Sequence, residues 1–327
     1  MRFPGKIPFM IAALAIAPAG VAQEKLFEYQ GKSYSLDTMS PAQKQALYEV
    51  EFERYMRIKE LADQAVLEMH IDAEALKQKK TPEEVKKKLF DSGDPSEKEM
   101  KEFYDKNKDK IPYPYDQVKD QLKQHMKQEK ATKTQQDILE KVKKQGAFAF
   151  KLPEPVSPVV EIKTEGMPVK GNAGAKVTVV EFADYQCPHC REAFDAWEKA
   201  WPDVKEKIRF VYVDYPINAS GISKIVAQGA YCANKQNKFW EYHSMAFKRQ
   251  AELSKEIPKK FAEELKLDVK AFEACVNSKE ALAHIEKSKA EGDRVGIRGT
   301  PTIFLNGRRY VNAHDPEKLK EAINKAL

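Results

Sequence analysis

Apolar residues recur at three- and four-residue steps through the first half of the chain, between many Glu, Lys and Arg residues. This period predicts amphipathic helices. The longest row comprises Leu47, Tyr48, Phe52, Tyr55, Ile58, Ala62, Val66 and Met69. Ser96 followed by Glu99 is a capping-box pattern that predicts the start of another helix, and a further helix is expected from about Tyr115 to Val142. We therefore predict that residues 23–150 form a separate all-α domain.

The pattern changes after residue 150. Residues 151–175 contain four prolines that prevent a continuous helix, so we expect a linker there, with a short first strand at Val156–Ile162. From residue 176, β-branched and aromatic runs predict strands at Val177–Ala183 and Ile208–Asp214, and a hairpin of Thr302–Leu305 and Arg309–Val311 that turns at Asn306-Gly307. Helices are expected at about 188–200, 219–235, 238–250, 255–266, 269–291 and from 315. This order predicts an α/β domain over 176–327 with a helical insert at about 219–291.

Composition excludes several classes of protein. Of the 327 residues, 42% are hydrophobic and 32% are charged, which excludes a polytopic membrane protein and a fully disordered chain. The formal net charge is +6. Basic and acidic residues are equal in number over 23–150, so the lysine runs 77–80 and 86–88 are interpreted as solvated helix faces. We therefore expect no nucleic-acid partner.

The N-terminus has the pattern of a secretory signal peptide. Arg2 and Lys6 precede an apolar run from Ile7 to Ala17, and Gly20-Val21-Ala22 supplies small residues for cleavage. The run is shorter than the roughly 20 apolar residues of a transmembrane helix, although an uncleaved signal anchor is an alternative. We predict that residues 1–22 are removed and that the mature protein lies in the periplasm, where cysteines can form disulfides.

Cys187-Pro188-His189-Cys190 lies where a predicted strand gives way to a predicted helix. A thiol at a helix N-terminus meets unpaired N–H groups and the positive end of the helix dipole, which favour the thiolate, and a protonated His189 would add to this effect. A c-type haem site would need a histidine at position 191, which is Arg191. A zinc site would have to recruit the distant Cys232 and Cys275, which have no paired spacing. The pattern therefore favours a redox-active disulfide over either metal site.

Glu181 lies in a strand that is apolar on both faces, as expected for the centre of a sheet. A carboxyl group buried there should have a raised pKa and could exchange a proton with Cys190. The alternative is an edge strand that leaves Glu181 in water.

Four motifs together resemble those of the DsbA family of thioredoxin-fold proteins. They are Val180-Glu181-Phe182, Cys187-Pro-His-Cys190, Phe239-Trp-Glu-Tyr-His243 and Gly299-Thr-Pro-Thr302. The resemblance covers about residues 156–327 and implies a thioredoxin-like fold with a helical insertion. It implies that Cys187 is the attacking sulfur, Cys190 the resolving one and Glu181 the buried acid, with no cofactor besides the Cys187–Cys190 disulfide. It also implies a cis-proline at Pro301, beside which Thr300 would bind an extended substrate strand.

The resemblance also bears on the remaining cysteines and histidines. Similar proteins carry a second cysteine pair in the insert, which implies a structural disulfide between Cys232 and Cys275; otherwise these are two small buried side chains. We expect His243, His284 and His314 to be surface or packing residues. No metal ligand is predicted.

Residues 40–150, with Glu97 to Lys110 and the Lys/Gln-rich helix after Tyr115, resemble the helical domain of SurA-type periplasmic chaperones. Such a domain could bind unfolded clients, form a homo-oligomer, or act as a spacer.

We predict a thiol–disulfide oxidoreductase for cysteine-containing secreted proteins, served by a membrane redox partner of the DsbB or DsbD type. Oxidase is slightly favoured over isomerase, although Thr300 is typical of isomerase relatives. The alternative function is a chaperone or adaptor that uses the thioredoxin domain for binding only.

Overall fold

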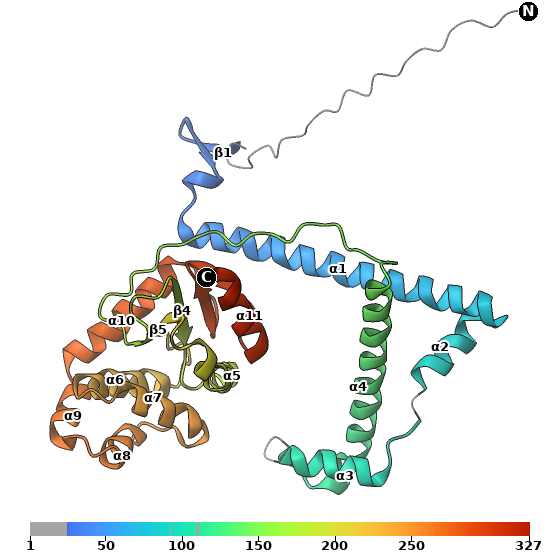
Figure 1. Cartoon of the computed structure of the whole chain (residues 1–327). Helices are drawn as coiled ribbons and strands as arrows, with labels where there is room; N and C mark the ends of the chain where they lie inside the picture. The colour runs from blue at the N-terminus through green and yellow to red at the C-terminus, as the bar shows by residue number, and fades with distance from the viewer. Residues whose placement is uncertain (1–24, 92, 109–110) are drawn as a thin grey trace, which may run out of the picture. The chain divides into compact units, whose positions relative to one another are not determined.

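The computed structural model describes residues 25–91, 93–108 and 111–327 (Figure 1). The predicted signal peptide, residues 1–22, lies outside this range. The chain divides into two compact units, one formed by residues 25–49 with 156–327 and the other by residues 50–155. None of the helices within the described ranges has the length and apolar character needed to cross a membrane.

The unit of residues 50–155 is all-helical. It contains most of α1 (Pro41–Gln78), together with α2 (Pro82–Phe90), α3 (Glu97–Lys106) and α4 (Tyr115–Lys144). Ser96 caps α3 as predicted: its hydroxyl accepts a hydrogen bond from the Glu99 N–H, and the Glu99 carboxylate accepts one from the Ser96 N–H. Ile71, Ala75 and Val85 form a small buried cluster between α1 and α2. The all-α prediction is confirmed for this unit.

The helical prediction was wrong for the residues before α1. Strands β1 (Lys25–Tyr29) and β2 (Lys32–Ser35) form an antiparallel hairpin. Gln30 and Gly31 connect them, and both have positive φ angles, 51° and 73°, as the tight turn of a two-residue hairpin requires. The hairpin is followed by a 3-10 turn at Leu36–Thr38.

The larger unit contains a five-stranded sheet in the order β3-β5-β4-β6-β7. The strands are β3 (Val169–Gly171), β4 (Val177–Ala183), β5 (Ile208–Asp214), β6 (Thr302–Leu305) and β7 (Arg308–Tyr310). β4 and β5 are parallel and the other pairs are antiparallel. Both predicted central strands and the Asn306-Gly307 hairpin are confirmed, because the apolar runs and the turn residues specify them locally.

The helices of this unit are α5 (Pro188–Val204), α6 (Ile222–Lys235), α7 (Phe239–Lys248), α8 (Ile257–Glu264), α9 (Val269–Val276), α10 (Lys279–Arg294) and α11 (Pro316–Ala326), with a 3-10 turn at Gln250–Glu252. One face of the sheet packs with residues of α5, α6, α7 and α11 into the main core (Figure 1). The other face packs with residues 295–297 and with Val160 and Met167 of the segment before β3.

Two predicted elements differ from the structure. Val156–Ile162 is not a strand, because Pro158 has no N–H to donate and only the Val160 N–H reaches the sheet region, donating to the Gly307 carbonyl at 2.9 Å. The single helix predicted at 269–291 is two helices. The first ends at Val276, and Ser278 caps the second, since its hydroxyl accepts a hydrogen bond from the Ala281 N–H at 3.1 Å.

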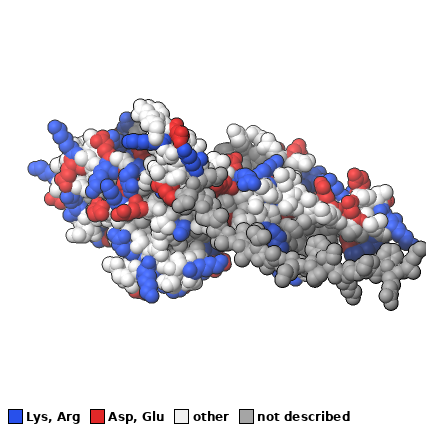
Figure 2. Space-filling view, turned by 90° about the horizontal axis from the view of Figure 1, so that it is seen from above, with Lys and Arg blue, Asp and Glu red and all other residues white. Residues whose placement is uncertain are grey.

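On the face that Figure 2 shows, Lys and Arg side chains alternate with Asp and Glu, and no extended area carries one sign alone. Several ion pairs join side chains of the same helix, such as Lys289 with Asp293.

Candidate active site

Cys187 and Cys190 lie at the junction between β4 and α5. β4 ends at Ala183, and the N–H of Cys187 donates to the carbonyl of Asp184 at 3.0 Å, which closes a turn between the strand and the helix. Cys187 is the N-cap of α5 and Pro188 is its first residue, a position where a missing N–H costs nothing. Both cysteines are free thiols in this structure; Cys187 is half-buried, whereas Cys190 is 1% exposed.

The surroundings of Cys187 favour its thiolate. A hydrogen bond from the Cys190 thiol is the largest contribution, and a hydrogen bond from Thr300 and the N–H groups of His189 and Cys190 add to it. Together they outweigh partial burial and lower the pKa of Cys187 to about 5. Cys187 is therefore largely ionised at neutral pH.

Cys190 has the opposite character. Burial raises its pKa far above the ordinary range for a thiol, and its hydrogen bond to Cys187 raises the pKa further. Its sulfur accepts one hydrogen bond, from the N–H of Asp184 at 3.5 Å. The pair thus consists of an accessible thiolate and an inaccessible thiol, an asymmetry that agrees with the role of attacking sulfur predicted for Cys187.

The loop before β6 borders the two cysteines. The Thr300–Pro301 peptide bond is cis. The thiol of Cys187 lies 3.2 Å from the Thr300 carbonyl oxygen, to which it can donate a hydrogen bond. The Thr300 hydroxyl is buried, and its interaction with Cys187 helps to lower the pKa of that thiol. Thr300 therefore offers both an acceptor for the Cys187 thiol and a donor for its thiolate.

Glu181 lies in the centre of the sheet, opposite Tyr212 of β5 and Ile303 of β6. It is 4% exposed, so the alternative of an edge strand was wrong. Burial raises the pKa of Glu181 to about 8, and the charge of Lys170 partly offsets this effect. The structure describes no direct contact between the Glu181 carboxyl group and Cys190, so proton exchange between them stays a prediction.

Sequence reasoning missed three residues that support the site. Asp184 is buried and accepts hydrogen bonds from the N–H groups of Ile217 and Asn218 and from the hydroxyl of Ser223. The Gln250 amide donates to the carbonyl of Cys187 at 2.9 Å. These contacts fix the loop before α5 to the helical insert. A polar residue directly after a buried strand was the only signal for Asp184, and Gln250 had none.

Lys170 is the third missed residue. Its ammonium group lies 4.2 Å from the ring centre of Trp201 and 4.8 Å from that of Trp240. Burial lowers its pKa, although the charges of Glu198 and Glu181 oppose this shift. It supplies positive charge near Glu181 from β3, a strand that the sequence pattern did not predict.

Comparison with known families agrees with this geometry. Residues 163–325 match the family model described as Thioredoxin. The C-terminal half of this chain is a thioredoxin-like domain. The resemblance inferred from the sequence is thereby confirmed for this half, at the level of a thioredoxin-like fold with a helical insert. The likeness of residues 40–150 to SurA-type chaperones stays a prediction.

Curated relatives differ in how much of their length the chain matches. A match to disulfide bond formation protein D of Bacillus subtilis is 27% identical and covers 50% of this chain and 78% of that protein. A match to a Na(+)/H(+) antiporter NhaA of Salinispora arenicola is 32% identical and covers 49% of this chain but only 24% of the antiporter. The chain therefore spans about a quarter of the antiporter's length. The crystal structure of oxidised BdbD from Bacillus subtilis is 25% identical, with a TM-score of 0.48 over 52% of this chain and 98% of that one.

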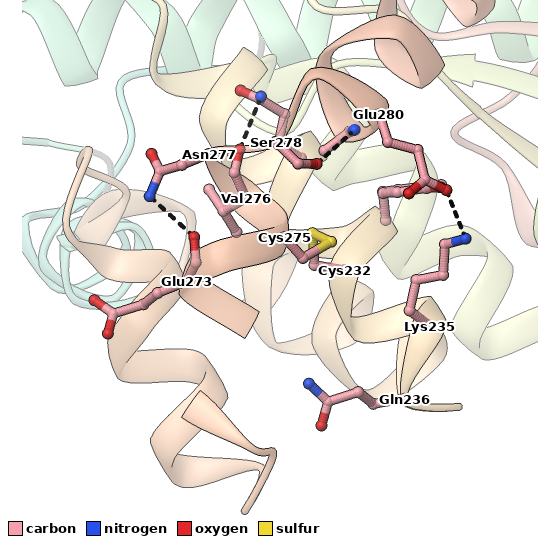
Figure 3. The surroundings of a disulfide bond; sticks show 12 residues. Cys232, Lys235, Gln236, Glu273, Cys275, Val276, Asn277, Ser278 and Glu280 are labelled. Atoms are coloured by element: carbon pink, nitrogen blue, oxygen red, sulfur yellow. Dashed lines mark hydrogen bonds and ion pairs between the residues drawn. A yellow bond between two sulfur atoms is a disulfide. The ribbon is translucent and has the colours of Figure 1, made fainter. Parts of the chain in front are cut away.

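A disulfide joins Cys232 of α6 to Cys275 of α9 within the insert of the thioredoxin-like domain (Figure 3). Cys232 is buried and lies in the main core. Beside it, Lys235 forms an ion pair with Glu280 at 2.7 Å, so α6 is also linked to the start of α10. The disulfide closes a loop of the insert and lies outside the turn that holds Cys187.

The histidines divide by environment. His243 is buried, shares a hydrogen bond of 3.2 Å with the Tyr185 hydroxyl, and has its pKa lowered by burial. His284 stacks on the Tyr231 ring. His189 is exposed and contacts Glu192, and this hydrogen bond raises the pKa of its imidazole. His314 lies beside the same carboxylate.

Proposed function

We propose that this protein is an exported thiol–disulfide oxidoreductase that forms or rearranges disulfides in secreted proteins through Cys187 and Cys190. The observation that carries the proposal is the asymmetry of the pair. An accessible sulfur with a pKa of about 5 lies next to a buried sulfur with a strongly raised pKa. A low pKa makes Cys187 a good leaving group, and burial protects Cys190 from client thiols.

In the oxidase direction, a client thiolate attacks the Cys187 sulfur of the oxidised protein. The Cys187–Cys190 bond breaks, a mixed disulfide forms, and Cys190 leaves with the bonding electron pair and takes up a proton. Glu181, with its pKa of about 8, is our candidate proton donor. A second client thiolate then attacks the client sulfur and expels the Cys187 thiolate. The client has lost two electrons and the protein holds them as a dithiol.

A partner must restore the starting state. A membrane oxidase of the DsbB type would accept the two electrons if the protein is an oxidase, and a membrane reductase of the DsbD type would keep the pair reduced if it is an isomerase. The requirement follows from the electron balance of the exchange. The predicted signal peptide supports the periplasm as the place of both reactions.

The test is to trap the mixed disulfide. A Cys190→Ala variant in the parent cell should retain clients on Cys187, and these are identified after separation without reductant. The redox state of Cys187 in the unmodified protein then distinguishes the directions: a mainly oxidised site supports an oxidase, and a mainly reduced site supports an isomerase. Absence of mixed disulfides, with full activity of Cys187→Ala toward reduced or scrambled ribonuclease, would refute the proposal.

A second candidate function is supported by the helical unit. Within residues 50–155, helix α1 carries large apolar side chains with exposed fractions between 45% and 82%. They are Met56, Leu61, Met69 and Leu76. Exposed apolar side chains of this number favour a binding surface, for unfolded clients or for a second copy of the chain. Suppression of client aggregation by a Cys187→Ala/Cys190→Ala variant would support chaperone activity, and light scattering of the mature protein would reveal a homo-oligomer.

A further inference from the structure

Two imidazoles and one carboxylate lie together next to the cysteine pair. They belong to His189, His314 and Glu192. The Nδ1 atom of His189 lies 3.1 Å from a Glu192 carboxylate oxygen, and the Nδ1 atom of His314 lies 3.8 Å from the same oxygen. Candidate ligand atoms of all three residues lie within 4.8 Å of one another. It is the one cluster of potential metal ligands found over residues 25–91, 93–108 and 111–327.

The fold fixes the backbone of all three residues. His189 and Glu192 lie in the first two turns of α5, one helical turn apart, so their side chains lie on the same side of the helix. His314 lies between the buried Ala313 and Asp315, whose carboxylate caps α11 by accepting hydrogen bonds from the Glu317 and Lys318 N–H groups. Helices α5 and α11 pack against each other (Figure 1). The three positions are thus held together although His314 is distant in the sequence.

The ligand types fit zinc. Two imidazole nitrogens and one carboxylate oxygen are a common zinc ligand set, and at tetrahedral zinc such atoms lie about 3.3 Å apart. The separations of 3.1 and 3.8 Å lie on either side of this value. All three side chains are exposed and can adjust their rotamers, with side-chain exposed fractions of 69% for His189, 54% for Glu192 and 46% for His314.

We propose that His189, Glu192 and His314 form a binding site for a divalent ion of the zinc class beside the cysteine pair. Binding requires both imidazoles to be neutral, so zinc displaces any proton that Glu192 stabilises on His189. In the oxidised protein a water molecule would complete the coordination of the ion.

The test is calorimetric titration of the oxidised full-length mature protein with zinc chloride, since oxidation removes the Cys187 and Cys190 thiols as competing ligands. We expect saturable one-to-one binding. His314→Gln and Glu192→Gln should each weaken it by about tenfold or more, because each removes a ligand. The matched control is His125→Gln, which removes an exposed imidazole of α4 far from any part of the cluster in sequence.

Two results would overturn the proposal: no saturable binding by the oxidised protein, or equal binding by the unmodified protein and His314→Gln. Circular dichroism of each variant checks that a loss of binding does not come from unfolding. The titration does not use exchange activity. A protein that binds zinc but does not exchange disulfides would support the zinc site and refute the proposed function. A protein that exchanges disulfides but does not bind zinc would refute the zinc site and support the proposed function.

Discussion

Cys187 is the N-cap of helix α5, whereas Cys232 lies inside α6 and is bonded to Cys275 of α9 (Figure 3). Cys187 is half-buried and surrounded by donors that lower its pKa to about 5. Cys232 is 1% exposed and packs in the main core. Cys187 and Cys232 therefore share a domain and a residue type but differ in exposure, in hydrogen-bond donors and in bonding state.

The difference shows what makes a cysteine reactive. Ionisation of Cys187 depends on its place at a helix N-terminus, on the Cys190 thiol and on Thr300. A sulfur buried in the core, such as that of Cys232, lacks the access that attack by a client thiolate requires. Four predictions can break or sharpen this contrast, in order of expected effect.

Replacing Cys187 by Ala should have the largest effect. We expect disulfide exchange with reduced ribonuclease to fall by about a thousandfold or more, because no other accessible low-pKa sulfur is described in the domain. The matched control is the double variant Cys232→Ala/Cys275→Ala, which should exchange at nearly the unmodified rate. If the control loses exchange while Cys187→Ala keeps it, the assignment of the two pairs is reversed.

The same double variant should instead lose stability. The disulfide closes a loop with a sequence separation of 43 residues, for which chain-entropy reasoning gives roughly 4 kcal/mol of stabilisation. Urea unfolding of the full chain measures the loss in the transition of the thioredoxin-like domain. An unchanged midpoint would mean that the insert is held by packing alone.

Glu181 should make the stability of the oxidised protein fall as the pH rises. Burial raises its pKa to about 8 in the folded protein from the ordinary value of 4.5, so the folded state holds more protons than the unfolded state between these values. The free energy of unfolding should decrease by roughly 3 to 4 kcal/mol between pH 5 and pH 8 on account of this group. Denaturant titrations at several pH values should show a flatter profile for Glu181→Gln. Identical slopes would contradict the burial of a neutral carboxyl group.

Thr300→Val should have the smallest effect. The substitution removes a hydrogen bond that lowers the pKa of Cys187, so the midpoint of thiolate absorbance should rise from about 5 by less than roughly one pH unit. Thr302→Val is the matched control, because the Thr302 hydroxyl donates to the Gly299 carbonyl and not to a cysteine. A rise with Thr302→Val but not with Thr300→Val would remove Thr300 from the site.

The sequence by itself determined the elements whose signals are local. The apolar runs specified β4 and β5, Asn306-Gly307 specified the hairpin, and the Ser96–Glu99 box specified α3. The motif Cys187-Pro-His-Cys190 also specified the candidate chemistry, since a helix N-terminus follows directly from the strand–turn–helix pattern. The pattern of apolar residues gave a wrong strand at Val156–Ile162, which contains a proline. It also gave one helix instead of two around Ser278, whose hydroxyl caps a new helix.

Only the tertiary structure decided which distant groups meet. Lys170, Gln250 and His314 are ordinary polar residues in the sequence, yet the fold places them near Glu181, Cys187 and Glu192 respectively. Their proximity depends on how β3 pairs with β5, how the insert closes over the turn after β4, and how α11 packs on α5. A sequence pattern reports neighbours along the chain, and electrostatic and ligand chemistry depends on neighbours in space.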